Sequence, residues 1–253
     1  MISLRGKHVL VVGGSRGIGA GAAKLAAEAG ASVSITYRTN DAEANQIVSD
    51  IAKHEGQALA LKADVQDETA LNAAFGKAVE RFGPPAGVVI SAGVFEHMPI
   101  ETMTLEFWNR TIGINLTGTF LSVKAAAKYM RPAKTGGSIV IYTSTAGQSG
   151  GGGGASAYST SKAGQIIFMR SMAAELGADR IRVNCIAPAW TETDMAAASF
   201  KKLGYDNVKK GFPLGRIGQV KDVANATIFL LSDMAEFITG TTVTVDGGMA
   251  MRG

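Results

Sequence analysis

Short apolar segments rich in β-branched residues alternate with helix-length segments along the whole chain. Alternation of this kind is typical of βαβ units, whose strands lie parallel in one sheet that helices cover on both faces. The predicted fold class is therefore α/β, a doubly wound parallel sheet of about seven strands with right-handed crossovers. Strands are expected at residues 8–12, 33–37, 58–61, 87–90, 138–142, 181–186 and 242–245, and the main helices up to residue 28 and at 41–54, 67–82, 105–130, 157–176 and 222–231.

The 253 residues have room for one large α/β domain or for two small ones. No linker or internal repeat interrupts the pattern, and the glycine run at 150–154 is too short to join two domains. We therefore predict a single domain over residues 1–253. Gly113 and Gly118 weaken the long central helix locally. Residues 191–212 have weaker patterning, which predicts a mobile substrate loop.

Composition argues against several kinds of partner. The net charge of +4 comes from scattered basic residues without interleaved aromatics, which gives nucleic-acid binding little support. No apolar run approaches the ~18 residues of a membrane span, and no signal-peptide segment precedes the first strand, so the expected compartment is the cytoplasm and no membrane partner is expected. Cys185 is the one cysteine, and His8, His54 and His97 lie too far apart in sequence to predict a metal site.

A glycine loop follows the first expected strand and opens the first helix. Its glycines are Gly13, Gly17 and Gly19. Glycine lets the backbone approach an anion closely, and a helix N-terminus directs N–H groups and partial positive charge toward it. A simple tight turn is the alternative. At the head of a doubly wound sheet, the loop predicts dinucleotide binding.

The second expected strand ends in Tyr37 and Arg38, where sites that prefer NAD usually carry an acidic residue. No carboxylate is therefore available there for a ribose 2′-hydroxyl. Arg38, together with Arg16 in the glycine loop, could instead hold a 2′-phosphate, because guanidinium matches phosphate oxygens. The alternative is two solvated surface arginines. The cofactor predicted is NADP(H).

Tyr158 and Lys162 lie four positions apart in the helix expected at 157–176, so they share one helix face. A tyrosine poised beside a cation can give a proton to a forming alkoxide or take one from an alcohol. The alternative is an amphipathic helix with a lysine that extends its amine to solvent.

Taken together, these motifs resemble the short-chain dehydrogenase/reductase family, and the resemblance covers nearly the whole chain. It implies a single Rossmann-type domain and assembly into a homotetramer. The residues that carry it, in chain order, are the glycine loop, Asp64, Asn115, Ser144, Tyr158 with Lys162, and Val245-Asp246-Gly247-Gly248.

The resemblance also implies catalytic roles. Tyr158 is the expected acid/base, Lys162 lowers its pKa and binds the nicotinamide ribose, and Ser144 hydrogen-bonds the substrate oxygen. Asn115 holds a water in a proton relay behind Lys162. Asp64 is expected at the adenine and Thr193 at the carboxamide. The cofactor-binding residues implied are Gly13, Ser15, Arg16, Gly17, Ile18, Gly19, Tyr37, Arg38, Asp64, Val65, Ser91, Ala92, Gly93, Tyr158, Lys162, Pro188, Thr191 and Thr193.

The activity that fits is NADPH-dependent reduction of a ketone or aldehyde, reversible as alcohol oxidation. The subgroup most similar in sequence is the β-ketoacyl-carrier-protein reductases. An arginine in that subgroup helps to dock the acidic carrier protein, and Ala174 stands in its place here, so a small carbonyl compound is favoured over a carrier-bound chain. The substrate pocket is expected to include Phe95, Ser144, Gly154, Tyr158, Trp190, Met195, Phe200 and Tyr205, with His97 as pocket wall or surface.

A non-enzymatic role is the alternative from another class. Some proteins of this fold bind the dinucleotide and act as regulators without turnover. Such proteins usually lose the tyrosine or the lysine of the site, and this chain keeps both Tyr158 and Lys162. An enzyme is therefore expected.

Overall fold

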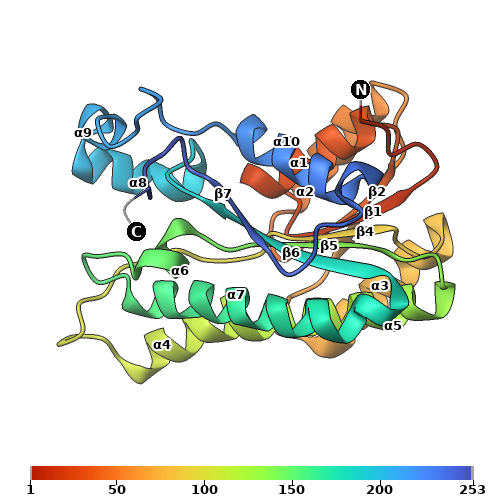
Figure 1. The fold of residues 1–253 in the computed structure, drawn as a ribbon, viewed down its shortest axis with the longest axis horizontal. Coiled ribbons are helices and arrows are strands. Elements are labelled where there is room, and N and C mark those ends of the chain that lie inside the picture. Colours follow the sequence, from red (N-terminus) through yellow and green to blue (C-terminus); the bar gives the residue numbers. More distant parts are fainter. Residues whose placement is uncertain (1, 252–253) are drawn as a thin grey trace.

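The computed structural model describes residues 2–251, and its centre is one seven-stranded sheet. The strand order is β3-β2-β1-β4-β5-β6-β7, and every neighbouring pair is parallel. Figure 1 shows the sheet between two layers of helices, which confirms the predicted doubly wound α/β fold. The strands are β1 (His8–Val12), β2 (Ser32–Tyr37), β3 (Ala58–Lys62), β4 (Gly87–Ile90), β5 (Gly137–Tyr142), β6 (Ile181–Pro188) and β7 (Thr242–Val245).

Helices cover both faces of the sheet (Figure 1). One layer contains α1 (Gly17–Glu28), α2 (Asp41–Ala52) and α10 (Val220–Leu231), and the other contains α3 (Glu68–Phe82), α5 (Gly118–Ala133) and α7 (Ser156–Leu176). Each layer has its own apolar core against the sheet.

Strand β1 shows why the sheet is buried on both faces. Side chains of a strand alternate between its two faces, so Leu10 and Val12 enter one core while Val9 and Val11 enter the other. None of the four is more than 1% exposed. A strand buried in this way is mainly apolar, which is why most strands appear in the sequence as apolar runs. Buried polar exceptions are His8 in β1 and Ser34 and Thr36 in β2.

The long central helix is interrupted where two glycines weakened its pattern. It begins as α4 (Leu105–Ile112), continues as a π-helical turn η1 (Gly113–Thr117) and ends as α5. A π-turn widens the helix by one residue, and such turns are frequent at functional sites. The turn contains Asn115, which is fully buried.

Several short helices were not predicted. They are α6 (Thr145–Ser149), α8 (Asp194–Leu203), α9 (Tyr205–Lys209), η2 (Gly177–Asp179) and η3 (Asp233–Ala235). The segment 191–212, predicted to be a mobile loop, thus holds α8 and α9. Its mobility stays a prediction.

No helix within residues 2–251 combines the length and the hydropathy needed to cross a membrane. The described residues also contain no group of three or more His, Cys, Asp or Glu side chains arranged to hold a metal ion.

Candidate active site

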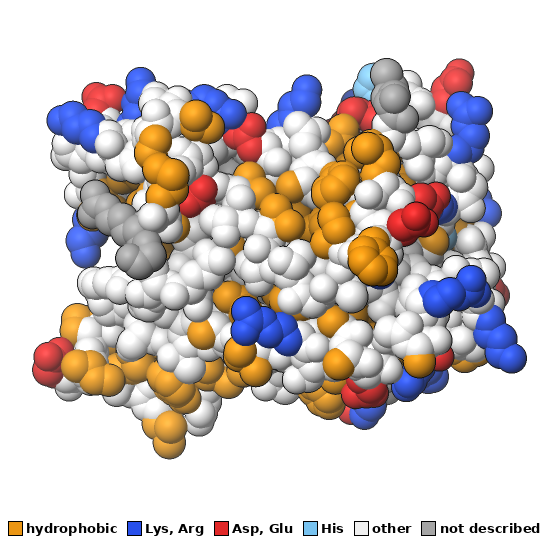
Figure 2. All heavy atoms as spheres, viewed as in Figure 1, with side chains coloured by type: hydrophobic (Ala, Val, Ile, Leu, Met, Phe, Trp, Pro, Cys, Tyr) orange, Lys and Arg blue, Asp and Glu red, His pale blue; other side chains and the backbone are white. Residues whose placement is uncertain are grey.

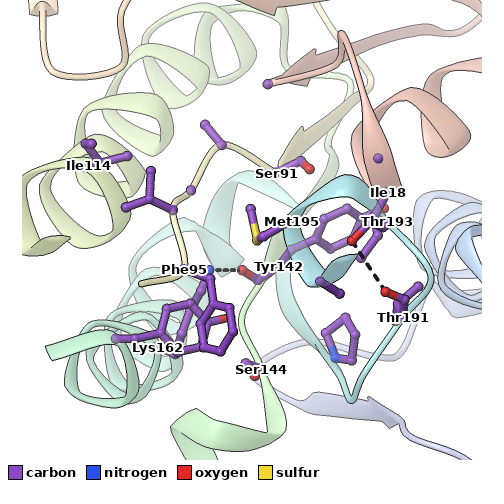
Figure 3. Close-up of a pocket in the computed structure, with 18 of the residues that line it drawn as sticks. Ile18, Ser91, Phe95, Ile114, Tyr142, Ser144, Lys162, Thr191, Thr193 and Met195 are labelled. Carbon is purple, nitrogen blue, oxygen red and sulfur yellow. Dashed lines mark hydrogen bonds between the residues drawn. The ribbon is translucent and has the colours of Figure 1, made fainter. Parts of the chain in front are cut away.

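A cavity of about 620 Å³ lies at the carboxyl ends of the central strands (Figure 3). It extends from the glycine loop after β1, past the segments that follow β2, β4 and β5, to the segment that follows β6. Strands β1 and β4 are neighbours although two strands separate them in sequence, so the strand order reverses at this point. Ligands of open α/β sheets bind in the crevice at such a switch point.

The glycine loop forms one end of this cavity, and its glycines have different tasks. Gly13 has φ +79°, and a Cβ on it would lie 2.7 Å from the backbone of Ala92. Gly17 has φ +55° and opens α1, whose N-cap Arg16 provides no side-chain cap. Because helix N-terminal N–H groups have no intrahelical partner, those of α1 are open to an anion in the cavity. Gly19 does not line the cavity; a Cβ on it would lie 2.3 Å from Gly13 O, so it allows close packing of the loop.

Charged side chains surround the part of the cavity next to β2. Arg16, Arg38 and Asp64 line it, and Arg38 Nη1 lies 4.0 Å from Asp64 Oδ2. This ion pair is long and solvent-exposed, so it restrains Arg38 only weakly. Tyr37 also lines the cavity and forms a side-chain hydrogen bond with Asp41. Asp41 is in turn paired with Lys62, whose Nζ lies 3.2 Å from Asp41 Oδ1. The arginines therefore remain available to an anionic group.

Five lining residues at this end were missed: Thr36, Thr39, Asn40, Glu43 and Ala63. Asn40 caps α2, since its Oδ1 accepts a hydrogen bond from Glu43 N at 3.1 Å. The Asn-x-x-Glu pattern is a helix-start signal that could have found this turn. One carboxylate oxygen of Glu43 is buried without a hydrogen-bond partner.

Two helices bring three of the four expected catalytic side chains to the cavity. Ser144 is the N-cap of α6, directly after β5, and Tyr158 and Lys162 occupy successive turns of α7. All three line the cavity. Lys162 is only 6% exposed, and its Nζ donates a hydrogen bond to Tyr142 O at 2.7 Å (Figure 3). The Nζ also lies 5.7 Å from the centre of the Tyr158 ring.

The acid–base properties differ from expectation on one point. Burial raises the pKa of Tyr158, and a hydrogen bond with Ser144 opposes this shift only in part. We expected Lys162 to lower the pKa of Tyr158, and in this structure burial outweighs any such effect. Burial also lowers the pKa of Lys162 to about 8, because an apolar environment disfavours the charged ammonium.

Asn115 lies behind the cavity and does not line it. Its side chain accepts from Val94 N at 2.8 Å and donates to Val94 O and to Ser161 Oγ, both at 3.0 Å. Its main-chain oxygen accepts from Thr119 Oγ1 at 2.6 Å and from Gln165 Nε2 at 2.8 Å. The side chain is thus a clamp on the segment after β4, and the expected relay water stays a prediction.

Aromatic side chains form the other end of the cavity. Phe95 packs edge-on against Tyr158, with ring centroids 4.7 Å apart, and Trp190 lies 5.7 Å from Phe95. Phe200 and Tyr205 do not line the cavity; Phe200 packs behind Trp190 at 5.7 Å, and Tyr205 packs on Phe200. Phe200 and Tyr205 were expected to be pocket walls. In the structure, Phe200 instead packs against Trp190, which does line the cavity, and Tyr205 packs against Phe200.

Gly154 also lies outside the large cavity. Its oxygen accepts a hydrogen bond from Met98 N at 3.0 Å, and a Cβ on it would lie 2.8 Å from the backbone of Met98. His97 lines the cavity and pairs with Gly153 O at 3.1 Å, in keeping with a wall position.

All other residues expected to bind cofactor or substrate line the cavity. The expected members of the lining are Gly13, Ser15, Arg16, Gly17, Ile18, Tyr37, Arg38, Asp64, Val65, Ser91, Ala92, Gly93, Phe95, Ser144, Tyr158, Lys162, Pro188, Trp190, Thr191, Thr193 and Met195.

The turn that carries Ser144 is packed directly on the backbone of α7. A Cβ on Gly147 would lie 2.7 Å from the carbonyl carbon of Lys162, so only glycine allows this approach. The hydroxyl of Thr143 donates to Lys162 O at 2.7 Å. The serine and the lysine are therefore fixed relative to each other by backbone contacts.

Comparison with known proteins gives the same assignment over almost the full length. A family model described as enoyl-(acyl carrier protein) reductase matches residues 12–250. A 3-oxoacyl-(acyl-carrier-protein) reductase of Synechocystis sp. is 36% identical over 99% of this chain and 100% of its own. A short-chain type dehydrogenase/reductase from Mycobacterium ulcerans has a TM-score of 0.92 and 35% identity, over 99% of this chain and 92% of that chain. The chain belongs to the short-chain dehydrogenase/reductase family.

Relatives with similar sequence identity to this chain are named for different substrates. An L-rhamnose 1-dehydrogenase (NAD(P)(+)) of Sphingomonas sp. is 38% identical, with 97% of each chain covered. As a short-chain dehydrogenase/reductase, the protein is an oxidoreductase of a family that uses nicotinamide dinucleotides. The resemblance found from sequence motifs is confirmed.

Proposed function

We propose that the protein is an NADPH-dependent reductase of small ketones or aldehydes, able to run in reverse as an alcohol dehydrogenase. One observation carries the proposal: Ser144 and Tyr158 line the same cavity as the glycine loop. A dinucleotide that extends from the loop would place its reactive end beside these two hydroxyls. The cavity is also lined by apolar and aromatic side chains such as Phe95 and Trp190, which suit a partly apolar carbonyl compound.

The proton chemistry follows from the side chains. The cofactor supplies the hydride. Reduction builds negative charge on the carbonyl oxygen, and two fixed hydroxyl donors, Ser144 and Tyr158, stabilise that charge. The raised pKa of Tyr158 keeps its phenol protonated in the absence of cofactor, so the proton is available for transfer. The positive charge of Lys162 then stabilises the phenolate that remains.

The residues present fit a dinucleotide. The backbone approach at Gly13 and the open N-terminus of α1 suit a pyrophosphate. Arg16 and Arg38 line the adenosine end and offer two guanidinium groups to a 2′-phosphate. No acidic residue ends β2, where it would bind the 2′-hydroxyl of NADH. These features favour NADPH.

A carrier-bound 3-oxoacyl chain is the second candidate substrate, because relatives of this chain are named for that activity. Ala174 offers no charge to an acidic carrier protein. Arg131 is engaged within the chain, with Nε 2.7 Å from Asp179 Oδ2 and Nη1 3.8 Å from Glu175 Oε1. An arginine held by two carboxylates is a poor docking site, which favours the small substrate.

The test is oxidation of NADPH by the purified protein with a panel of ketones, aldehydes, β-keto esters and a 3-oxoacyl carrier-protein thioester. We expect turnover of a small carbonyl compound. We expect kcat/KM for the carrier-bound thioester to exceed that of the matching β-keto ester by less than about a hundredfold, the effect of roughly 2.7 kcal/mol of docking. A larger preference would assign the carrier-bound substrate. Tight NADPH binding without turnover of any compound would instead favour a dinucleotide-binding regulator.

A further inference from the structure

Gln165 is a fully buried amide on α7 that the proposed chemistry does not use. It is 0% exposed. Its Nε2 donates to Asn115 O at 2.8 Å and to Thr119 Oγ1 at 2.7 Å. The carbonyl of Asn115 can only accept, so the donor end of the amide must face it. The other end, Oε1, is buried without a hydrogen-bond partner.

An unpartnered buried oxygen lowers stability, because the group loses its hydration and gains nothing in return. An apolar side chain of the same size would avoid this cost. Asn115 O would still accept a hydrogen bond from Thr119 Oγ1, so no second group would be orphaned. Stability alone therefore does not explain a glutamine at this position.

The contacts of Gln165 extend to the cavity through Asn115. Asn115 sits in the π-turn, and its side chain holds both the N–H and the carbonyl of Val94. The segment around Val94 places Gly93 beside Lys162, since a Cβ on Gly93 would lie 3.7 Å from Lys162 Nζ. The same segment places Phe95 against Tyr158.

Asn115 also reaches the tyrosine by a second route. Its Nδ2 donates to Ser161 Oγ, and Ser161 Oγ donates to Tyr158 O at 2.7 Å. Asn115 is thus linked to Tyr158 in two ways, through the segment that carries Phe95 and through Ser161.

We infer that Gln165 is a positioning residue: by fixing the Asn115 carbonyl, it holds the π-turn and, through Asn115, the segment Ser91–Phe95 against Tyr158 and the cofactor cavity. This inference rests on the proposed function for its kinetic consequence. The positioning itself is a property of the chain and can be measured without turnover.

The first test compares Gln165→Met with the unmodified protein. We expect the thermal midpoint to change by less than about 3 °C, while kcat falls by about tenfold or more, within the ~100-fold that an ångström of misplacement costs. We also expect faster amide hydrogen exchange at Val94, whose N–H is held by Asn115. Ser122→Ala is the matched control, because Ser122 is buried on α5 and donates to Gly118 O at 2.7 Å without reaching the cavity.

The outcomes separate the two proposals. Unchanged exchange at Val94 in a folded Gln165→Met protein overturns the positioning role, as does an equal effect in Ser122→Ala. If the unmodified protein reduces no carbonyl compound, the proposed function fails, and the exchange measurement still decides the role of Gln165.

Gln165→Glu gives a second test should the methionine variant fail to fold. Burial raises the pKa of a carboxyl group, and the neutral acid can donate its proton to Asn115 O. Its carboxylate would repel that oxygen. We expect kcat relative to the unmodified protein to fall as pH rises through the pKa of the introduced group, in step with faster exchange at Val94. A ratio that does not vary with pH, together with unchanged exchange, overturns the inference.

Discussion

Lys162 and Tyr142 are joined by a hydrogen bond that crosses from α7 to the end of β5. Lys162 Nζ donates to Tyr142 O over 2.7 Å, in surroundings that leave the lysine 6% exposed. One of three ammonium N–H groups is thereby satisfied, and the Nζ is held on the cavity side of the sheet. The lysine is thus oriented before any ligand binds, with its Nζ 5.7 Å from the centre of the Tyr158 ring.

Removal of the Tyr158 hydroxyl tests the proton donor. Tyr158→Phe keeps the ring that packs against Phe95 and removes the proton, so we expect kcat to fall by ~10²–10⁴-fold while the Kd for NADPH stays nearly unchanged. Steady-state kinetics and NADPH fluorescence check this. Tyr129→Phe is the control, since Tyr129 bonds Asn72 O away from the cavity. More than about a tenth of the original kcat in Tyr158→Phe would argue against general acid catalysis.

Loss of Lys162 should have a broader effect. Lys162→Ala removes the charge that stabilises a phenolate and the amine proposed to bind the nicotinamide ribose. We therefore expect both a lower kcat and a higher Kd for NADPH. Weakened turnover with unaltered NADPH binding would contradict the ribose contact and leave only the electrostatic role.

The pH dependence follows from the lowered pKa of Lys162. In the cofactor-free protein its pKa is about 8, so the ammonium is lost as pH rises through that value. We expect kcat/KM for carbonyl reduction to decline above pH 8, measured against NADPH oxidation. Titration of Lys162 by NMR provides the direct check, and a pKa near the ordinary lysine value of 10.5 would refute the assignment.

The same shift affects stability. The folded-state pKa of Lys162 lies below the unfolded value of 10.5, so between about pH 8 and 10.5 the unfolded chain binds more protons. This lysine therefore destabilises the fold fully below pH 8, and the cost is relieved as pH rises toward 10.5. We expect the Lys162→Met variant to lack this component when denaturant unfolding is compared across that pH range.

The cofactor preference depends on Arg16 and Arg38. Charge-assisted contacts to a 2′-phosphate contribute roughly 1.5–3 kcal/mol each before screening, and solvent exposure reduces this to about 1–3 kcal/mol in total. We expect kcat/KM for NADPH to exceed that for NADH by about ten- to a few-hundredfold. The ratio should shrink as ionic strength rises. Equal values for the two cofactors would falsify the NADPH assignment.

A double substitution should reverse that preference. Tyr37→Asp with Arg38→Gln supplies a carboxylate for the free 2′-hydroxyl and removes a cation from the phosphate. Arg81→Gln is the control, because Arg81 is exposed on α3 and lies outside the cavity lining. A double variant that still prefers NADPH would show that the strand-end residues do not select the cofactor.

Assembly is expected from the exposed edge of the sheet. Strand β7 has a neighbour on one side only, and Met234 and Phe237, which follow α10, are 70% and 101% exposed. Figure 2 shows apolar side chains gathered on this face near α10 and β7. Such a surface is buried by association. We predict a homotetramer by light scattering, partly dissociated by Phe237→Glu, and a monomer mass at micromolar concentration would refute it.

The strands and long helices could be predicted because their sequence pattern follows from burial. Residues 8–12 and 87–90 coincide with β1 and β4, which are apolar apart from His8 because helices cover both their faces. The short helices α6, α8 and α9 escaped prediction. With five residues each, α6 and α9 are too short for an amphipathic pattern. The ten residues of α8 lie in the segment that was predicted to be a loop.

The site divides in the same way. The part of the cavity at the glycine loop was predictable, because glycines with restricted geometry leave traces in the sequence, and so does the tyrosine–lysine pair. At the aromatic end, Phe95, Trp190 and Met195 were predicted to line the cavity and do so. Nothing local in the sequence indicates that Phe200 packs behind Trp190 and outside the cavity. The sequence indicated the π-turn only as a locally weakened helix. The hydrogen bond that Gln165 donates to the main-chain oxygen of Asn115 joins residues 50 positions apart, so no local pattern reveals it.

The close approach of Gly147 to the backbone of Lys162 joins the turn that carries Ser144 to α7. In the loop that follows this turn, Gly150, Gly152 and Gly153 have open space where a side chain would begin. Changes in that loop can therefore reshape what reaches the hydroxyls without moving the hydroxyls themselves. We therefore expect substitutions in this loop to change which substrates are accepted more than they change the proton chemistry at Ser144 and Tyr158.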